Sequence, residues 1–98
     1  MSSSAPRVDE PDFDDHNVEE LARHGIHPIQ VFEVLAGQPL FVRNKRGRAA
    51  TYKVIGPDNG GTMLTIPIAA TTVPGHCRPV TGWASTKGEI TLWRKAYA

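Results

Sequence analysis

A helix stop followed at once by a helix start, close to the N-terminus, constrains the fold more than any other feature of this sequence. Asn17 and Glu20 have the spacing of a capping box, which predicts that a helix begins at residue 18. Gly25 can adopt the left-handed conformation that ends a helix, and Pro28 is favoured in the first turn of the next one. The pattern therefore predicts two short helices, over residues 18–24 and 28–36.

From residue 40 onward, short apolar segments alternate with turns, as is typical of β-strands. Residues 58–61 read Asp-Asn-Gly-Gly, which favours a tight hairpin between neighbouring strands. Leu64, Ile66 and Ile68 alternate onto one face, which fits a sheet covered on one side by the helices. The expected strands are residues 40–43, 49–55, 62–69 and 77–84.

A third helix is expected at the C-terminal end. Thr86 and Glu89 form another capping-box pattern, and Ile90, Trp93 and Tyr97 follow at the spacing of one helix face. The expected fold class is therefore α+β. It comprises two short N-terminal helices, a twisted antiparallel sheet of about four strands, and a C-terminal helix packed across the sheet.

The charge is distributed unevenly along a chain whose formal net charge is only +1. Residues 1–20 carry one basic and seven acidic side chains, whereas residues 21–98 carry ten basic and three acidic ones. We expect residues 1–12 to be a disordered acidic tail and residues 13–98 to form one domain. The basic domain would attract a polyanion such as RNA, or an acidic protein. The tail either solubilises the protein or folds back over the basic face.

Other classes of protein are disfavoured by composition. The single cysteine, Cys77, excludes an internal disulfide framework, and neither a secretory leader nor a membrane-length apolar run is present. These observations predict a cytoplasmic protein that does not act at a membrane. The sequence has no structural zinc pattern and no Gly-rich nucleotide-binding loop, so no metal or cofactor is expected.

Basic residues are densest between the first two expected strands. Four cations in six residues form an exposed patch suited to gripping phosphates without reading bases, and Lys53 on the next strand extends it. A solvated turn without a ligand is the alternative. The four cations are Arg43, Lys45, Arg46 and Arg48.

Six motifs of the chain occur in a defined order. They are Asn17-x-x-x-Leu21-x-x-His24-Gly25-Ile26, Val31-Phe32-Glu33-Val34-Leu35, Tyr52-Lys53-Val54-Ile55-Gly56, Met63-Leu64-Thr65-Ile66, Arg78-Pro79-Val80-Thr81-Gly82-Trp83-Ala84, and Tyr97 in the last helix. In this order they resemble the BrnT family of toxins from bacterial toxin–antitoxin systems, over about residues 13–97. The resemblance implies a RelE-like α+β domain that cleaves RNA. It also implies a cognate antitoxin protein that binds DNA and forms a hetero-oligomer with the toxin.

Metal-independent RNA cleavage requires an acid, a base and cations around the phosphorus. His24 matches the histidine of the family's His-Gly corner, although a histidine in the last turn of a helix is also a common cap. Arg78 matches a basic residue that starts the family's penultimate strand, and Thr81 lies on the same strand. Trp83 can stack on a base or pack against the last helix. The expected catalytic set is His24, Arg78 and Thr81.

Three positions depart from the family pattern. Thr51, Gly61-Thr62 and Gly82-Trp83 stand where family members usually carry arginine, which stabilises charge on a phosphate undergoing cleavage. Two functions therefore stay open. One is a BrnT-like ribonuclease, and the other is a catalytically inactive family member that binds a protein or a nucleic acid.

Overall fold

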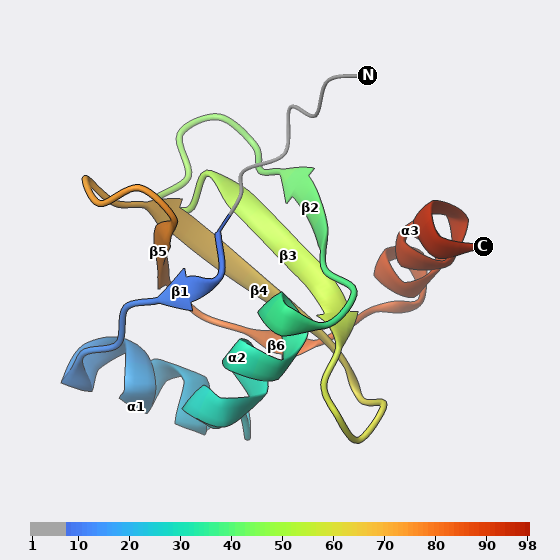
Figure 1. The fold of residues 1–98 in the computed structure, drawn as a ribbon, viewed down its shortest axis with the longest axis horizontal. Coiled ribbons are helices and arrows are strands. Elements are labelled where there is room, and N and C mark those ends of the chain that lie inside the picture. The colour runs from blue at the N-terminus through green and yellow to red at the C-terminus, as the bar shows by residue number, and fades with distance from the viewer. Residues whose placement is uncertain (1–7) are drawn as a thin grey trace.

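The computed structural model describes residues 8–98, which form an α+β fold of three helices and a six-stranded mixed sheet (Figure 1). The predicted fold class is therefore confirmed. In chain order the elements are β1 (Glu10–Pro11), α1 (Asp15–Arg23), α2 (Pro28–Ala36), β2 (Leu40–Arg43), β3 (Tyr52–Pro57), β4 (Met63–Ala70), β5 (His76–Pro79), β6 (Trp83–Ala84) and α3 (Lys87–Tyr97).

The sheet runs in the order β1-β5-β4-β3-β2, and β6 also pairs with β4. All its pairs are antiparallel except β1 with β5, so the expected antiparallel sheet of about four strands was too simple. The expected strand 77–84 is split into β5 and β6. The split occurs opposite Pro67, which has no N–H group for the ladder, although its carbonyl still accepts a hydrogen bond from the Val80 N–H at 2.9 Å.

Strand β1 corrects the expected boundary of the acidic tail at residue 12. Glu10 and Pro11 lie opposite His76 and Cys77 in parallel pairing, and the Asp12 N–H donates to the Cys77 carbonyl at 2.7 Å. Backbone pairing and ion pairs hold this segment in place. Neither leaves an apolar pattern in the sequence, so the segment's low apolar content wrongly indicated disorder. Residues 1–7 of the expected tail lie outside the described residues.

Helix α1 begins three residues earlier than predicted, because Asp14 is its N-cap in place of Asn17. Asp14 Oδ1 accepts from the Asn17 N–H at 2.8 Å, and Asn17 Oδ1 accepts from the Asp14 N–H at 2.9 Å. Such a cap is worth about 1 kcal/mol. The predicted corner is confirmed: Gly25 has a φ of +73°, and the Ile26 N–H closes the turn on the Leu21 carbonyl at 3.0 Å.

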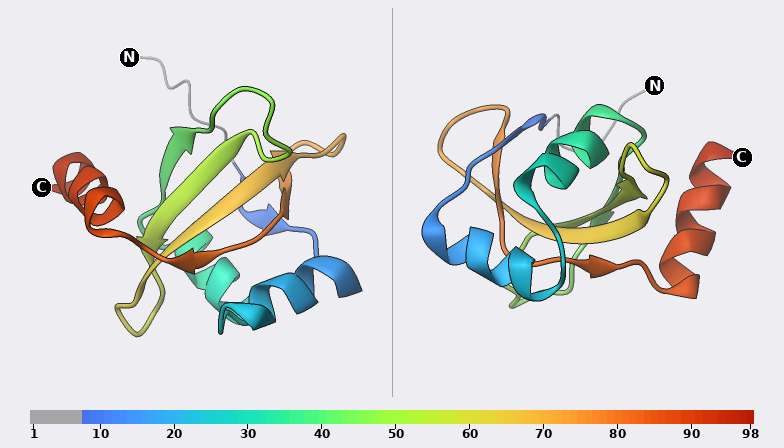
Figure 2. Two further views of the ribbon diagram at one scale, coloured as in Figure 1. Left: turned by 180° about the vertical axis from the view of Figure 1, so that it is seen from behind. Right: turned by 90° about the horizontal axis from the view of Figure 1, so that it is seen from below.

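The core lies between one face of the sheet and the first two helices. Leu64, Ile66 and Ile68 are at most 3% exposed, which confirms their predicted alternation onto one face. They pack in one cluster with Leu21 of α1 and Val34 of α2, and Figure 2 shows α2 over this face. Burial of each such side chain contributes about 1.5–3 kcal/mol.

Helix α3 begins at the predicted capping box of Thr86 and Glu89, but it does not pack across the sheet. None of its residues is buried, and it stands to one side of the sheet (Figures 1 and 2). The Trp93 indole N–H donates to the Gln38 carbonyl at 2.7 Å, and the Tyr97 hydroxyl donates to the Pro39 carbonyl at 2.6 Å. The expected stripe thus anchors α3 to the α2–β2 connection. Among residues 8–98, no helix combines the length and apolar character needed to cross a membrane.

Candidate nucleic-acid interface

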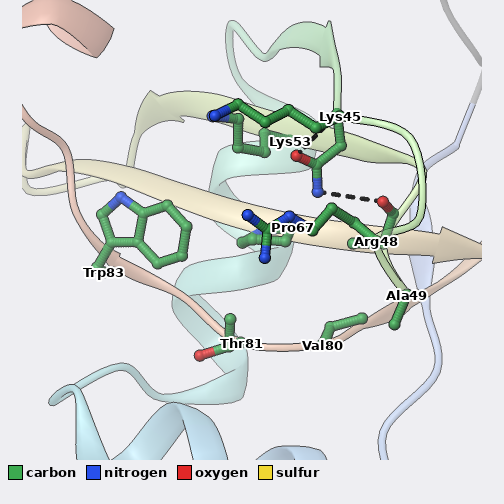
Figure 3. Close-up of a pocket in the computed structure, with 10 residues that line it drawn as sticks. Lys45, Arg48, Ala49, Lys53, Pro67, Val80, Thr81 and Trp83 are labelled. Carbon is green, nitrogen blue, oxygen red and sulfur yellow. Dashed lines mark hydrogen bonds between the residues drawn. The ribbon is translucent and has the colours of Figure 1, made fainter.

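An open hollow of about 440 Å³ lies on the face of the sheet that points away from the core (Figure 3). Its floor includes Pro67, which alternates along β4 with the buried Ile66 and Ile68 and therefore faces the other way. Its volume falls within the range of ligand sites, about 300–1,000 Å³.

Four of the six expected RNA-binding residues line this hollow. Lys45 and Arg48 come from the β2–β3 loop, Lys53 from the adjoining strand β3 and Trp83 from β6, so one basic stretch meets a strand that lies much later in the chain (Figure 3). The loop is closed by the Asn44 side-chain amide, which donates to the Ala50 carbonyl at 3.1 Å. This closure holds the loop cations beside the sheet.

Arg43 and Arg46, the other two expected RNA-binding residues, lie at an adjacent hollow of about 170 Å³. The Arg43 guanidinium lies 5.8 Å from the centroid of the Tyr52 ring, and its Nη1 is 3.5 Å from the Tyr52 hydroxyl. An exposed cation–π contact of this kind is worth about 0.5–1 kcal/mol. Arg43 therefore contributes to loop structure as well as to the positive charge of the surface.

The loop cations at the larger hollow are not neutralised. Within residues 8–98, no ion pair involves Lys45 or Arg48, whereas Lys53 Nζ lies 4.0 Å from Glu89 Oε2. Unpaired cations beside a sheet face create a positive potential that attracts a polyanion. The hollow thus combines two uncompensated positive charges with an aromatic ring.

Glu89 is a site residue that sequence reasoning identified only as a helix cap. Its Oε1 accepts from the Trp83 indole N–H at 3.0 Å and from the Thr65 hydroxyl at 3.0 Å. Burial alone would raise the Glu89 pKa, but hydrogen bonds from the Thr86 backbone and from Trp83 and Thr65 outweigh it and lower the pKa below its ordinary value. Glu89 is therefore an ionised carboxylate that holds Trp83 against α3. The indole ring of Trp83 meanwhile lines the hollow.

His24 and Thr81 are joined through Glu20, a second residue whose role the sequence did not reveal. Glu20 Oε2 accepts from the Thr81 hydroxyl at 2.8 Å and lies 3.3 Å from His24 Nε2. The hydrogen bond from Thr81 is the main cause that lowers the Glu20 pKa, with a smaller contribution from His24. Thr81 lines the hollow, but His24 does not.

Arg78, the third expected catalytic residue, lies elsewhere. Its guanidinium forms an ion pair and hydrogen bond with Asp14, the N-cap of α1. His24 follows α1 at its other end, roughly 15 Å along the helix axis at 1.5 Å per residue. The structure therefore does not bring His24, Arg78 and Thr81 together into one cluster, because Asp14 holds the guanidinium at the start of α1.

No three His, Cys, Asp or Glu side chains within residues 8–98 are grouped closely enough to hold a metal ion. Cys77 is buried, and this burial raises the pKa of its thiol to about 11, so the group is a neutral thiol at physiological pH.

Comparison with known proteins identified no relative: no protein-family model, no curated protein and no solved structure matches this chain.

Proposed function

We propose that this protein binds RNA, and that the hollow between the β2–β3 loop and β6 is its binding surface. One observation carries the proposal. Lys45 and Arg48, which have no carboxylate partner within residues 8–98, share a hollow with the indole ring of Trp83. Sequence-tolerant binding of a single strand uses two elements. Cations hold the phosphate backbone of the nucleic acid, and an aromatic face stacks on a base.

Binding without cleavage fits the geometry better than catalysis. The Arg78 charge is neutralised by Asp14, and His24 lies outside the hollow with its Nε2 beside Glu20. Of the expected catalytic set, only Thr81 would therefore lie beside a phosphate held by the loop cations, and His24 and Arg78 would not. This favours the catalytically inactive member of the BrnT-like class, acting as a nucleic-acid-binding module.

A second candidate is the BrnT-like ribonuclease toxin that acts with a cognate DNA-binding antitoxin. The chain of contacts from Thr81 through Glu20 to His24 favours it, because it connects a hydroxyl at the hollow to an imidazole. Incubation of the purified protein with a structured RNA in EDTA tests this candidate. Cleavage that disappears in His24→Ala supports the toxin, and intact RNA with or without ribosomes contradicts it.

Charge reversal in the loop tests the binding proposal. We expect Lys45→Glu with Arg48→Glu to weaken binding of a fluorescent RNA oligonucleotide roughly tenfold or more. The matched control is Arg94→Glu with Lys95→Glu, which makes the same charge change at exposed positions in the last turn of α3. Equal weakening by both pairs would show that only net charge matters and would refute the assigned surface.

Salt dependence gives an independent test of the same contacts. Each phosphate contact adds about one unit to the slope of log K against log salt concentration. We expect Arg48→Ala to reduce the magnitude of this slope by about 1, and Lys95→Ala to leave it unchanged. An unchanged slope in Arg48→Ala would mean that this guanidinium contacts no phosphate.

A further inference from the structure

The hollow has two chemically distinct ends. Lys45 and Arg48 enter from the β2–β3 loop, while Val80, Thr81 and Trp83 enter from the segment that links β5 to β6 and from β6 itself (Figure 3). The first end carries unpaired positive charge. The second carries the indole ring with small apolar and hydroxyl groups beside it, and Lys53, which also lines the hollow, lies 4.0 Å from the Glu89 carboxylate. A ligand with one anionic part and one flat aromatic part matches this division.

The indole ring is held in place before any ligand arrives. The Trp83 N–H donates to Glu89 Oε1, and Glu89 is itself fixed by the Thr65 hydroxyl and by the Thr86 N–H at 2.9 Å. The Glu89 side chain is only 12% exposed, and Thr65 is fully buried. A ring that is fixed in this way loses little conformational freedom when a ligand stacks on it, which favours binding.

The form of nucleic acid that can use such a ring is limited. In a duplex each base is stacked on its neighbours and offers only its edges in the grooves, whereas an unpaired base offers its flat face to an aromatic side chain. The hollow is bounded by the loop on one side and by the β5–β6 segment on the other. A ring that stacks on the face of a base therefore suits a single strand more than a double helix.

We propose that the hollow binds one unpaired nucleotide of a single strand, with its base on the Trp83 indole and its phosphates at Lys45 and Arg48, and that Glu89 is the positioning residue for the indole. This inference rests on the proposed function and extends it. It assigns the class of ligand, single-stranded nucleic acid, and it adds a residue that acts through Trp83 without contacting the ligand.

Tryptophan fluorescence tests the stacking, because the chain has only two tryptophans and the second, Trp93, lies on α3 against the Gln38 carbonyl. A single-stranded RNA oligonucleotide should quench the emission of the wild type and of Trp93→Phe, but not that of Trp83→Phe. Trp83→Ala should lower the affinity for the single strand roughly 5- to 100-fold. The same sequence annealed into a duplex should bind at least about tenfold more weakly.

Two substitutions at residue 89 separate positioning from general structure. Glu89→Gln keeps an oxygen that accepts the indole N–H and the cap N–H, so we expect quenching to be retained. Glu89→Ala removes that acceptor, so we expect weaker quenching and lower affinity while circular dichroism stays native. Equal quenching and affinity in the two variants would refute the role of Glu89.

The outcomes distinguish this inference from the proposed function. Failure of the folded protein to bind any RNA, single-stranded or duplex, would refute the proposed function and the inference together. Equal binding of single strand and duplex, without quenching of Trp83, would leave RNA binding intact and refute the inference alone. Equal binding of a single-stranded DNA oligonucleotide would support stacking, because every base has a flat face.

Discussion

The Thr81 hydroxyl donates a hydrogen bond to Glu20 Oε2 at 2.8 Å and so joins the segment between β5 and β6 to α1. Both residues were prominent in the sequence, Thr81 as a site residue and Glu20 as a cap. Their contact spans 61 positions of the chain. It connects the hollow to the His-Gly corner, and it is the main cause that lowers the pKa of the Glu20 carboxyl.

Removal of the Thr81 hydroxyl should change the titration of Glu20. The hydrogen bond lowers the Glu20 pKa, so Thr81→Val should raise that pKa toward its ordinary value. A group with a depressed pKa in the folded state stabilises the fold above its unfolded pKa and loses this contribution as the pH falls through the folded pKa. Thr81→Val should therefore show a weaker loss of stability on acidification. A carbon-13 titration of the Glu20 carboxyl checks this, with Thr91→Val, whose hydroxyl is exposed, as the control.

Substitution of Arg78 should have little effect on any RNA cleavage. Its guanidinium is paired with Asp14 at the opposite end of α1 from His24, and an exposed pair of this kind contributes little to stability because water screens it. If the purified protein cleaves RNA, Arg78→Ala should keep that activity, whereas Thr81→Val and His24→Ala should lower it. A loss of cleavage in Arg78→Ala that Arg78→Lys restores would contradict this assignment.

Gly82→Ala should destabilise the fold. A Cβ atom at residue 82 would lie 2.9 Å from Ile26 Cδ1 and 3.0 Å from Leu21 Cδ2, so the terminal methyl groups of two buried core side chains would have to shift. Overpacking of this kind costs about 1–3 kcal/mol. Gly88→Ala is the matched control, because only Thr86 Oγ1 at 4.0 Å is near its added Cβ and alanine is favoured in a helix by up to about 1 kcal/mol. Urea unfolding should show opposite changes in the two variants.

The attachment of β1 should weaken as the pH rises. His76 Nδ1 lies 2.7 Å from Asp12 Oδ1, and this hydrogen bond raises the His76 pKa, with smaller contributions from Glu10 and Asp9. Because the folded pKa is raised, the stabilisation is fully present below the unfolded pKa of about 6.5 and is lost as the pH rises through the folded pKa. Hydrogen exchange at the Asp12 amide should therefore accelerate above the folded pKa of His76, by more than its intrinsic pH dependence.

Carboxylate substitutions distinguish the effect of the Asp12–His76 contact on the His76 pKa from the effect of the negative charge around β1. Asp12→Asn should lower the His76 pKa in an NMR titration, since it removes the charged partner. Asp9→Asn removes the same charge at greater distance and should lower it less. Equal shifts in the two variants would show that the acidic segment acts only through its net charge.

Features of the fold that depend on neighbouring residues could be predicted from the sequence. Gly25, Pro28 and the Thr86–Glu89 pair set helix ends through backbone dihedrals and hydrogen bonds within one turn. The hairpin between β3 and β4 follows from Asp58, whose Oδ1 accepts from the backbone N–H groups of Gly60 and Thr62.

Choices between competing local patterns were made by the rest of the chain. Asp14 with Asn17 and Asn17 with Glu20 are both capping-box spacings, and local rules do not choose between them. The fold selects the first, since Asn17 is fully buried and donates to the Asp12 carbonyl at 3.0 Å, while Glu20 is engaged by Thr81.

The sequence by itself determined the fold class, the helix corner, the hairpin and the basic loop, because each follows from short-range chemistry or composition. Only the tertiary structure decided which of the candidate residues meet. It placed Lys45, Arg48, Lys53 and Trp83 around one hollow, and it held Arg78 away at Asp14. It also placed the Glu89 carboxylate of α3 at the indole N–H of Trp83 on β6. These contacts are set by strand register and by the packing of α1 and α3, which no local pattern of residues encodes.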